Sequence, residues 1–392
     1  MAINIFSRPV ELIKIDYESS LTDLIMDLEH LRRRRYEGTT PVTMFLELKA
    51  LFHLLESLGS ARLEGNRTAI ADIVEENINP TKGSLNEQQQ EVRNIEDALQ
   101  YIDEYIRTGN PISEVFLREI HKRIVKGLTL PPEGEGDPTP GKYRQSSVII
   151  TNSELDPPGS GSLVSSHMGA LVEFIQTSTA PKHDLLKTAI VHHRFTAIHP
   201  FNNGNGRTVR ALTYAMLLYQ EFSVAAVNRI LNPTAIFCND RATYIKNLVI
   251  ADKGTDEDLT IWCEYVINGL KVEIEKVNSL TDYNYVKKNI LLPAIKDAAE
   301  RKSISEEQAQ ILVIAVQKRV PIMSKDIVKA FPSHTNLKRS RLLSKMVALK
   351  LLKPIEPSSR KYVVSFSNSY LLRGVVEQLE VLGFIPNSVS QK

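Results

Sequence analysis

Cysteine is nearly absent from this sequence, and long apolar segments are missing. The 392 residues include two cysteines, Cys238 and Cys263, and no CxxC pair. We expect two reduced thiols, with a single bridge as the alternative, and no structural zinc site. No apolar run approaches the roughly 20 residues that span a bilayer, and residues 1–17 lack the apolar core of a signal peptide. These absences predict a cytoplasmic protein with no membrane partner.

The sequence as a whole also lacks a large excess of positive or negative charge, but its C-terminal part is basic and the rest is acidic. Lys and Arg number 48 and Asp and Glu 46, for a net charge of +2. Residues 291–392 hold 17 basic against 8 acidic residues, whereas the rest of the chain holds 31 against 38. A length of 392 residues exceeds one ordinary core. We therefore expect two or three domains with different partners.

The spacing of apolar residues predicts a mainly α protein. Gly59 is expected to end one helix, and Ser60 to cap a short one that ends at Gly65. The β-branched segment 143–152 predicts a short strand or hairpin arm between loops rich in Pro and Gly. Helical spacing predicts further helices over 20–36, 43–58, 90–107, 113–127, 163–179, 184–196, 206–222 and 256–278.

The string HPFNNGNGRTVR (199–210) combines a turn with the start of a helix. Residues 202–206 are all Asn or Gly and favour a turn. The helix that follows offers free N–H groups and a partial positive charge to an anion. Arg207 and Arg210 add two guanidinium groups on one face, and His199 can act as a base near neutral pH. No GK[ST] follows, which excludes a Walker loop. These residues predict a polyphosphate cradle, although an ordinary helix start has a similar pattern.

The same string resembles the signature of the Fic family, HPFx[DE]GNGRxxR, at eight of its nine fixed residues. Three other segments are similar to family segments. GKYRQSSVII (141–150) resembles the flap hairpin, RATYIKNL (241–248) the segment beside the adenine, and SARLEGN (60–66) the inhibitory pattern [ST]xxxE[GN]. The resemblance implies a Fic helical core with a small β-hairpin flap over 91–285. An N-terminal helical region, 1–90, would carry the inhibitory motif 60–66.

Fic enzymes transfer AMP from ATP to a Ser, Thr or Tyr hydroxyl of a protein, and the resemblance assigns roles on that basis. His199 would accept the hydroxyl proton. Tyr244 would pack near the adenine, with an ordinary core tyrosine as the alternative. The ATP-binding residues would be Asn203, Gly204, Asn205, Gly206, Arg207 and Arg210. The target would add a strand along Val148, Ile149, Ile150 and Thr151.

Two further positions bear on regulation and on the metal. Ser60 and Glu64 would inhibit the site by pairing Glu64 with Arg210, unless Glu64 is a solvated helix end. Asn203 replaces the family's acidic residue, which holds Mg²⁺. An amide oxygen is a weaker ligand for this hard cation. We therefore expect one of three consequences: Mg²⁺ or Mn²⁺ is bound by the phosphates alone, activity is weak, or the transferred group is not AMP.

Residues 300–370 predict a separate basic module. The module resembles a winged helix-turn-helix. Its predicted elements are a helix over 304–317, a second over 324–331 capped by Ser324, a third over 333–352, and a strand–turn–strand over 353–366. Lys338, Arg339 and Arg341 are placed where a recognition helix meets DNA phosphates. A protein-interaction module with a solvated basic face is the alternative.

Three functions remain open from the sequence. The first is a protein adenylyltransferase, inhibited by Glu64, whose target is a protein hydroxyl, including its own. The second is a nucleotide-sensing DNA-binding regulator with a weak Fic core, favoured by Asn203 and the basic module. The third is a hydrolase that removes AMP from a modified protein. A homodimer is compatible with all three.

Overall fold

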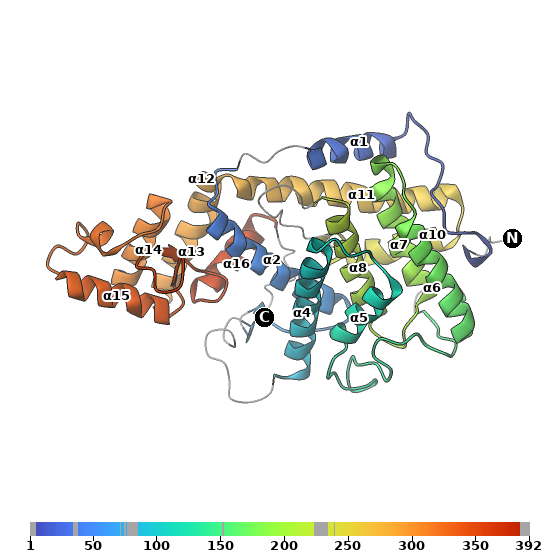
Figure 1. Cartoon of the computed structure of the whole chain (residues 1–392), viewed down its shortest axis with the longest axis horizontal. Helices are drawn as coiled ribbons and strands as arrows, with labels where there is room; N and C mark the ends of the chain where they lie inside the picture. The colour runs from blue at the N-terminus through green and yellow to red at the C-terminus, as the bar shows by residue number, and fades with distance from the viewer. Residues whose placement is uncertain are drawn as a thin grey trace. The chain divides into compact units, whose positions relative to one another are not determined.

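The computed structural model describes residues 5–33, 38–70, 72–73, 76, 85–150, 153–222, 234–238 and 240–384. It divides into two compact units (Figure 1). The first comprises residues 1–35, 53–67 and 85–274, and the second residues 36–52, 68–84 and 275–392. Within the described ranges, no helix is both long and apolar enough to cross a membrane. The predicted domain boundaries stay predictions.

The first unit is a helical bundle around α8 (Asn205–Tyr219), whose residues are nearly all buried. α7 (Asp184–Ile198), α4 (Glu87–Arg107) and α5 (Glu114–Ile124) pack against it. Polar side chains start several of these helices, as Asn86 does for α4 with a capping box. The remaining elements are η1 (Ile5–Ser7), α1 (Ser20–Arg33), α6 (Gly161–Gln176), η2 (Pro181–His183), α9 (Thr234–Cys238) and α10 (Arg241–Asp252). Two long helices, α2 (Val42–Leu63) and α11 (Asp256–Asn278), have residues in both units.

The second unit combines helices with one antiparallel hairpin. β1 (Leu352–Pro354) pairs with β2 (Tyr362–Val364), with Lys353 opposite Val363. α13 (Leu292–Glu300) packs against α14 (Glu306–Lys318) and α16 (Leu371–Val381). The other elements are η3 (Ser279–Thr281), α12 (Tyr283–Val286), a π-helical turn (Lys287–Leu291), η5 (Ser324–Ile327) and α15 (Asn336–Ala348).

The mainly α fold is confirmed, and three local predictions are wrong. α2 does not end at Gly59 but continues to Leu63, because burial of the residues on both sides outweighs the helix penalty of about 1 kcal/mol for glycine. Ser60 therefore lies inside a helix and caps none. Gly65, with φ of 105°, follows the end of α2 as expected.

The other two errors concern the flap and the basic module. Residues 143–150 form no strand in the described part of the chain, since no neighbouring strand pairs with them. Thr151 lies outside the described residues. The segment 324–331 forms only the short 3₁₀ turn η5 (Ser324–Ile327), followed by a non-helical turn before Pro332.

Candidate active site

The signature string forms the loop between α7 and α8. His199 follows α7 and Gly204 precedes α8, and both have left-handed backbone, with φ of 50° and 77°. A Cβ atom on Gly204 would lie 2.9 Å from Cγ1 of Val125, so conformation and space both require glycine. The Asn205 side chain accepts from the N–H of Phe201 and donates to its carbonyl, each at 2.9 Å. The Asn205 amide therefore fixes the shape of the loop.

His199 is partly exposed, and its imidazole is neutral at pH 7. Desolvation, the main cause, and the nearby charge of Arg144 lower the pKa of His199 to about 4. The buried Arg144 side chain donates to the carbonyls of His199 and Ile198, at 2.7 and 3.0 Å. Arg144 thus fixes the backbone at the end of α7. A neutral imidazole is the form that a general base requires.

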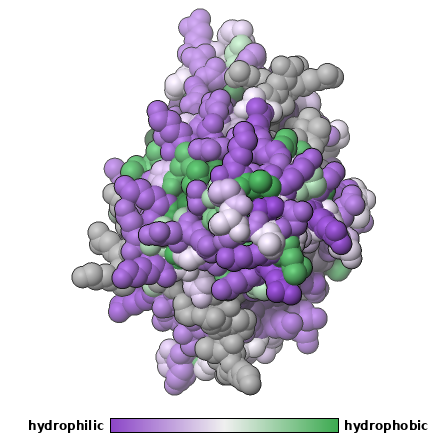
Figure 2. All heavy atoms as spheres, turned by 90° about the vertical axis from the view of Figure 1, so that its left-hand side faces the viewer, coloured by the Kyte–Doolittle hydropathy of each residue, from purple (hydrophilic) through white to green (hydrophobic). Residues whose placement is uncertain are grey.

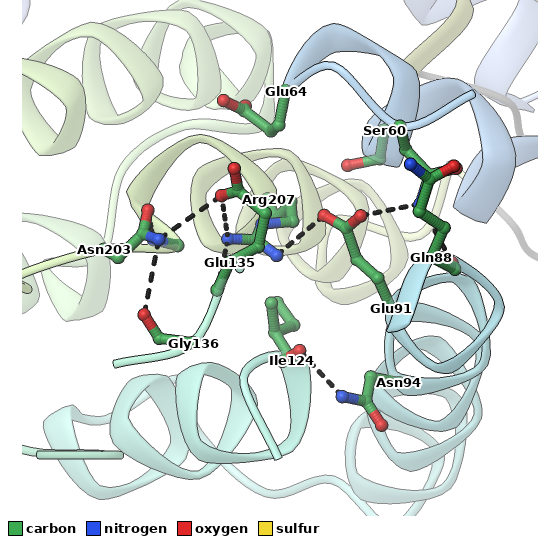
Figure 3. A network of polar contacts seen from close by, with 12 residues as sticks. Ser60, Glu64, Gln88, Glu91, Asn94, Ile124, Glu135, Gly136, Asn203 and Arg207 are labelled. Carbon is green, nitrogen blue, oxygen red and sulfur yellow. Dashed lines mark hydrogen bonds and ion pairs between the residues drawn. The ribbon is translucent and has the colours of Figure 1, made fainter. Parts of the chain in front are cut away.

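Arg207 is buried and bonded to two carboxylates (Figure 3). Its NH1 donates to Oε1 of Glu91 at 2.7 Å, and its NH2 donates to the carbonyl and Oε2 of Glu135 at 3.0 and 3.2 Å. The second oxygen of Glu91 accepts from Nδ2 of Asn66 at 2.7 Å. Burial raises the pKa of Glu91 even though the charge of Arg207 opposes the shift. Both terminal nitrogens of this arginine are therefore held by other protein groups.

Arg210 is bonded to the segment 60–66 at the end of α2. Its Nε donates to Oγ of Ser60 at 2.9 Å, and its NH2 donates to the Ser60 carbonyl at 2.9 Å and to Oε1 of Glu64 at 2.7 Å. A Cβ atom on Gly206 would lie 2.2 Å from the same Glu64 oxygen. The carboxylate therefore touches the first turn of α8, where the sequence predicts an anion.

The charge of Glu64 follows from this pairing. Burial alone would raise the pKa of Glu64, but the charge of Arg210 and its hydrogen bond lower it on balance. Glu64 is therefore ionised at neutral pH and opposes the charge of Arg210. Its side chain keeps 33 % of its surface exposed, so a competing anion has access to it.

Asn203 is surrounded by groups from the loop 130–141. Its Nδ2 donates to Oε2 of Glu135 and to the Gly136 carbonyl, both at 3.3 Å, and its Oδ1 accepts from the N–H of Gly204 at 2.7 Å. Its N–H donates to Oδ2 of Asp137 at 3.0 Å. Among the described residues, no three His, Cys, Asp or Glu side chains group as metal ligands. These donors do not make a metal site of their own.

Tyr244 lies beside Arg210, with which its hydroxyl interacts, whereas the flap is exposed to solvent. Tyr244 is buried, and its hydroxyl is 2.9 Å from Nε2 of His192 within a cluster of aromatic rings that includes Trp262. Ile149 of the flap is 93 % exposed, and its neighbours Val148 and Ile150 are partly exposed. The flap therefore offers irregular backbone with no partner strand among the described residues and an apolar side chain to solvent.

Several residues of this network were not singled out from the sequence. Arg144, Glu91, Glu135 and Asp137 contact the signature loop or Arg207 from outside the motif. Glu91 lies 116 positions before its arginine, so no local spacing indicates the pair. The acidic residues of the segment EGEGD (133–137) could have indicated Glu135 and Asp137 as site residues. They lie in a Pro- and Gly-rich loop, and loops often carry functional residues.

Comparison with known proteins gives a family match to the central part of the chain. Residues 111–217 match the Fic/DOC family model. The protein adenylyltransferase Fic of Aedes aegypti is 25 % identical over 244 residues, which cover 62 % of this chain and 42 % of that protein. The protein of the same name from Nematostella vectensis is 30 % identical over 167 residues, which cover 42 % and 34 %. The chain thus spans less than half the length of these relatives.

Solved structures show the same fold. A Fic family protein from Desulfovibrio desulfuricans superposes with a TM-score of 0.52 at 18 % identity, covering 91 % of this chain and 98 % of that one. A Fic domain containing signaling protein from Bacteroides thetaiotaomicron gives a TM-score of 0.50 at 20 % identity, covering 67 % and 98 %. Motif, fold and relatives agree, and residues 111–217 of this chain are a domain of the Fic/DOC family.

Proposed function

We propose that this protein is an adenylyltransferase that moves AMP from ATP to a Ser, Thr or Tyr hydroxyl of a protein, and that Glu64 inhibits it. The observation that carries the proposal is the position of the Glu64 carboxylate. It lies 2.7 Å from NH2 of Arg210 and against Gly206 at the start of α8. Relatives named protein adenylyltransferase Fic support the reaction class.

His199 is the base in this proposal. Its neutral imidazole takes the proton of the target hydroxyl, whose oxygen attacks the α-phosphorus of ATP. A new P–O bond forms to the target, the bond between the α-phosphorus and the bridging oxygen breaks, and pyrophosphate leaves with its negative charge. Arg210 and the amides of α8 stabilise that charge. In this proposal Mg²⁺ enters with ATP and is bound mainly by its phosphates, because the Asn203 amide is a weaker ligand than a carboxylate.

The flap is the proposed docking segment for the target. Residues 147–150 have no regular structure and no partner strand among the described residues. An extended peptide from a target can add to such a segment through main-chain hydrogen bonds. Exposed Ile149 adds an apolar contact.

Glu64→Gly tests the proposal directly. With MgATP carrying a label in the α-phosphate, the variant is expected to gain AMP on a hydroxyl residue, detected by mass spectrometry of the intact chain. The unmodified chain is expected to label at least about tenfold more slowly, because Glu64 occupies the anion site. His199→Ala added to Glu64→Gly removes the base and is expected to abolish labelling while ATP still binds in calorimetry.

Three outcomes would contradict the proposal. Equal labelling by Glu64→Gly and the parent chain would reject inhibition by Glu64. Retained labelling in the double variant would reject His199 as base. Transfer of a different group from ATP, or release of AMP from a chain labelled beforehand, would indicate another reaction at the same site.

A further inference from the structure

The C-terminal part of the second unit has the element order of a winged helix. α14, η5 and α15 precede the β1–β2 hairpin, and α15 packs against β1. Ile322, before η5, forms a β-bridge with Tyr362 of β2 and so ties the turn to the hairpin. Thr335 caps α15 by accepting from the N–H of Lys338. This arrangement presents one face of α15 and the 355–361 connection of the hairpin to solvent.

The exposed face of α15 carries a stripe of cations. Lys338, Arg341 and Lys345 are exposed and lie three and four positions apart, which places them on one side of the helix. The buried side is formed by Leu343, Met346 and the stem of Arg339. Arg339 corrects the sequence prediction, because its guanidinium donates to the Phe331 carbonyl and faces inward.

Two basic side chains of this module, Lys318 and Lys353, are neutralised by carboxylates, but the stripe is not. Lys318 pairs with Asp326 at 2.5 Å, and Lys353 pairs with Glu47 at 2.5 Å. Within the described ranges, Lys338, Arg341 and Lys345 have no carboxylate partner, and neither do the exposed Arg360 and Lys361 in the hairpin connection. Segment 324–361 carries 10 Lys and Arg against two acidic residues. Uncompensated cations on a helix and on a neighbouring hairpin are an electrostatic footprint for a polyanion.

We propose that this surface binds duplex DNA, with α15 in the major groove and the hairpin connection beside it on the backbone. The stripe is about 10 Å long at 1.5 Å per residue, so its cations reach phosphates along one groove. A major groove about 12 Å wide admits an α-helix. Exposed Ser344, beside Arg341 on the helix surface, offers a hydroxyl group to base edges.

Two other partner classes fit less well. Cores of protein interfaces are poor in lysine and rich in aromatic residues, and among the exposed residues of α15 only Leu337 is a large apolar side chain. Figure 2, which looks onto the side that carries α14 and α15 in Figure 1, shows a mostly hydrophilic face with small apolar groups. Double-stranded RNA has a deep, narrow major groove that side chains do not read. The stripe therefore matches DNA best.

The test measures binding of the full chain to a fluorescent random-sequence DNA duplex by anisotropy over a salt series. The parent chain is expected to bind at low salt and to lose affinity steeply as salt rises. Changing Lys338, Arg341 and Lys345 together to Ala should weaken binding about tenfold or more, and the log–log salt slope should shrink by about 0.9 for each lost phosphate contact.

The matched control changes Lys14, Lys126 and Lys182 to Ala, which removes the same charge from exposed positions in the first unit. It should bind like the parent. A second variant, Arg360 and Lys361 to Ala, should weaken binding in the same direction, and thermal melts confirm that each variant folds. Equal binding by the stripe and control variants would overturn the proposal, as would no binding at low salt or tighter binding to duplex RNA. AMP transfer is a separate readout, so failure here leaves the proposed function untouched.

Discussion

At the scale of single residues, the position of Asn203 stands out because it faces an acid. Its amide donates to Glu135, which also accepts from Arg207. An aspartate at the same place would put two carboxylates in contact and would lose this donor. The neutral amide of Asn203 can donate to the acidic loop 130–141, which a carboxylate cannot do. A carboxylate at this position would instead be the better ligand for a bound metal ion.

Asn203→Asp is therefore expected to have opposite effects with and without metal. Without Mg²⁺ it should lower the melting temperature by a few degrees, because repulsion from Glu135 replaces a hydrogen bond. In the presence of Mg²⁺ the variant should bind ATP more tightly than the parent, since the new carboxylate adds a charged oxygen ligand for the metal ion. Calorimetry of ATP binding with and without Mg²⁺ measures the difference. Asn284→Asp, at an exposed position in the other unit, is the control, and an equal Mg²⁺ effect in both variants would contradict the argument.

At the scale of elements, the end of α2 is joined to the start of α4. Asn66 follows α2 and donates to the Gln88 carbonyl at 2.9 Å and to Glu91 at 2.7 Å. Glu91 in turn holds Arg207, while Glu64, the residue after α2, holds Arg210. The residues that follow α2 therefore contact Arg210 directly, through Glu64, and Arg207 indirectly, through Asn66 and Glu91.

Asn66→Ala should weaken inhibition without touching Arg210. Loss of the two hydrogen bonds loosens the segment that carries Glu64, so labelling by AMP should rise above the parent but stay below Glu64→Gly. Arg67→Ala, next to it and exposed, is the control. Labelling rates measured side by side for the three variants decide the order, and no gain in Asn66→Ala would mean that α2 is held by its other contacts alone.

The elements also show what the sequence was able to predict. Long helices and the turn before α8 followed from apolar spacing and from the Asn and Gly run, both of which are local signals. The Glu64–Arg210 contact came from a family pattern. The end of α2, the unpaired flap and the short turn η5 did not follow, because burial and the presence or absence of a partner strand depend on distant residues. Glu91 and Glu135 were missed for the same reason.

At the scale of the whole molecule, α2 belongs to both units. Its first half contains Glu47, which is buried in the second unit and accepts from Nζ of Lys353 at 2.5 Å. The N–H groups of Phe366 and Ser367 also donate to Glu47, at 2.8 and 3.0 Å. Burial by itself raises the pKa of Glu47, but Lys353 and these donors lower it below the usual value. The helix that leads to Glu64 therefore begins in the second unit.

The lowered pKa of Glu47 makes the second unit sensitive to acid. A carboxyl with a depressed folded-state pKa adds stability that is complete above its unfolded-state pKa and is lost as pH falls through the folded-state pKa. Glu47→Gln should lower the free energy of unfolding by about 1–3 kcal/mol at neutral pH. As pH falls toward about 3, the variant should lose less of its remaining stability than the parent, because it has no carboxylate at position 47 to protonate. Urea unfolding across this range measures it, with Glu300→Gln at an exposed site as control. A Glu47→Gln chain that loses as much stability in acid as the parent would assign the sensitivity to other groups.

The contact between Glu64 and Arg210 makes the inhibitor a tethered ligand. A carboxylate fixed to the same chain competes at an effective concentration set by its attachment and does not dilute away. In the proposed function, free ATP must outcompete it, so occupancy would follow the cellular nucleotide level. Any substitution that strengthens the attraction of Arg210 for phosphate also strengthens its attraction for Glu64. Tighter substrate binding and lasting inhibition thus rise together, and only displacement of α2 separates them.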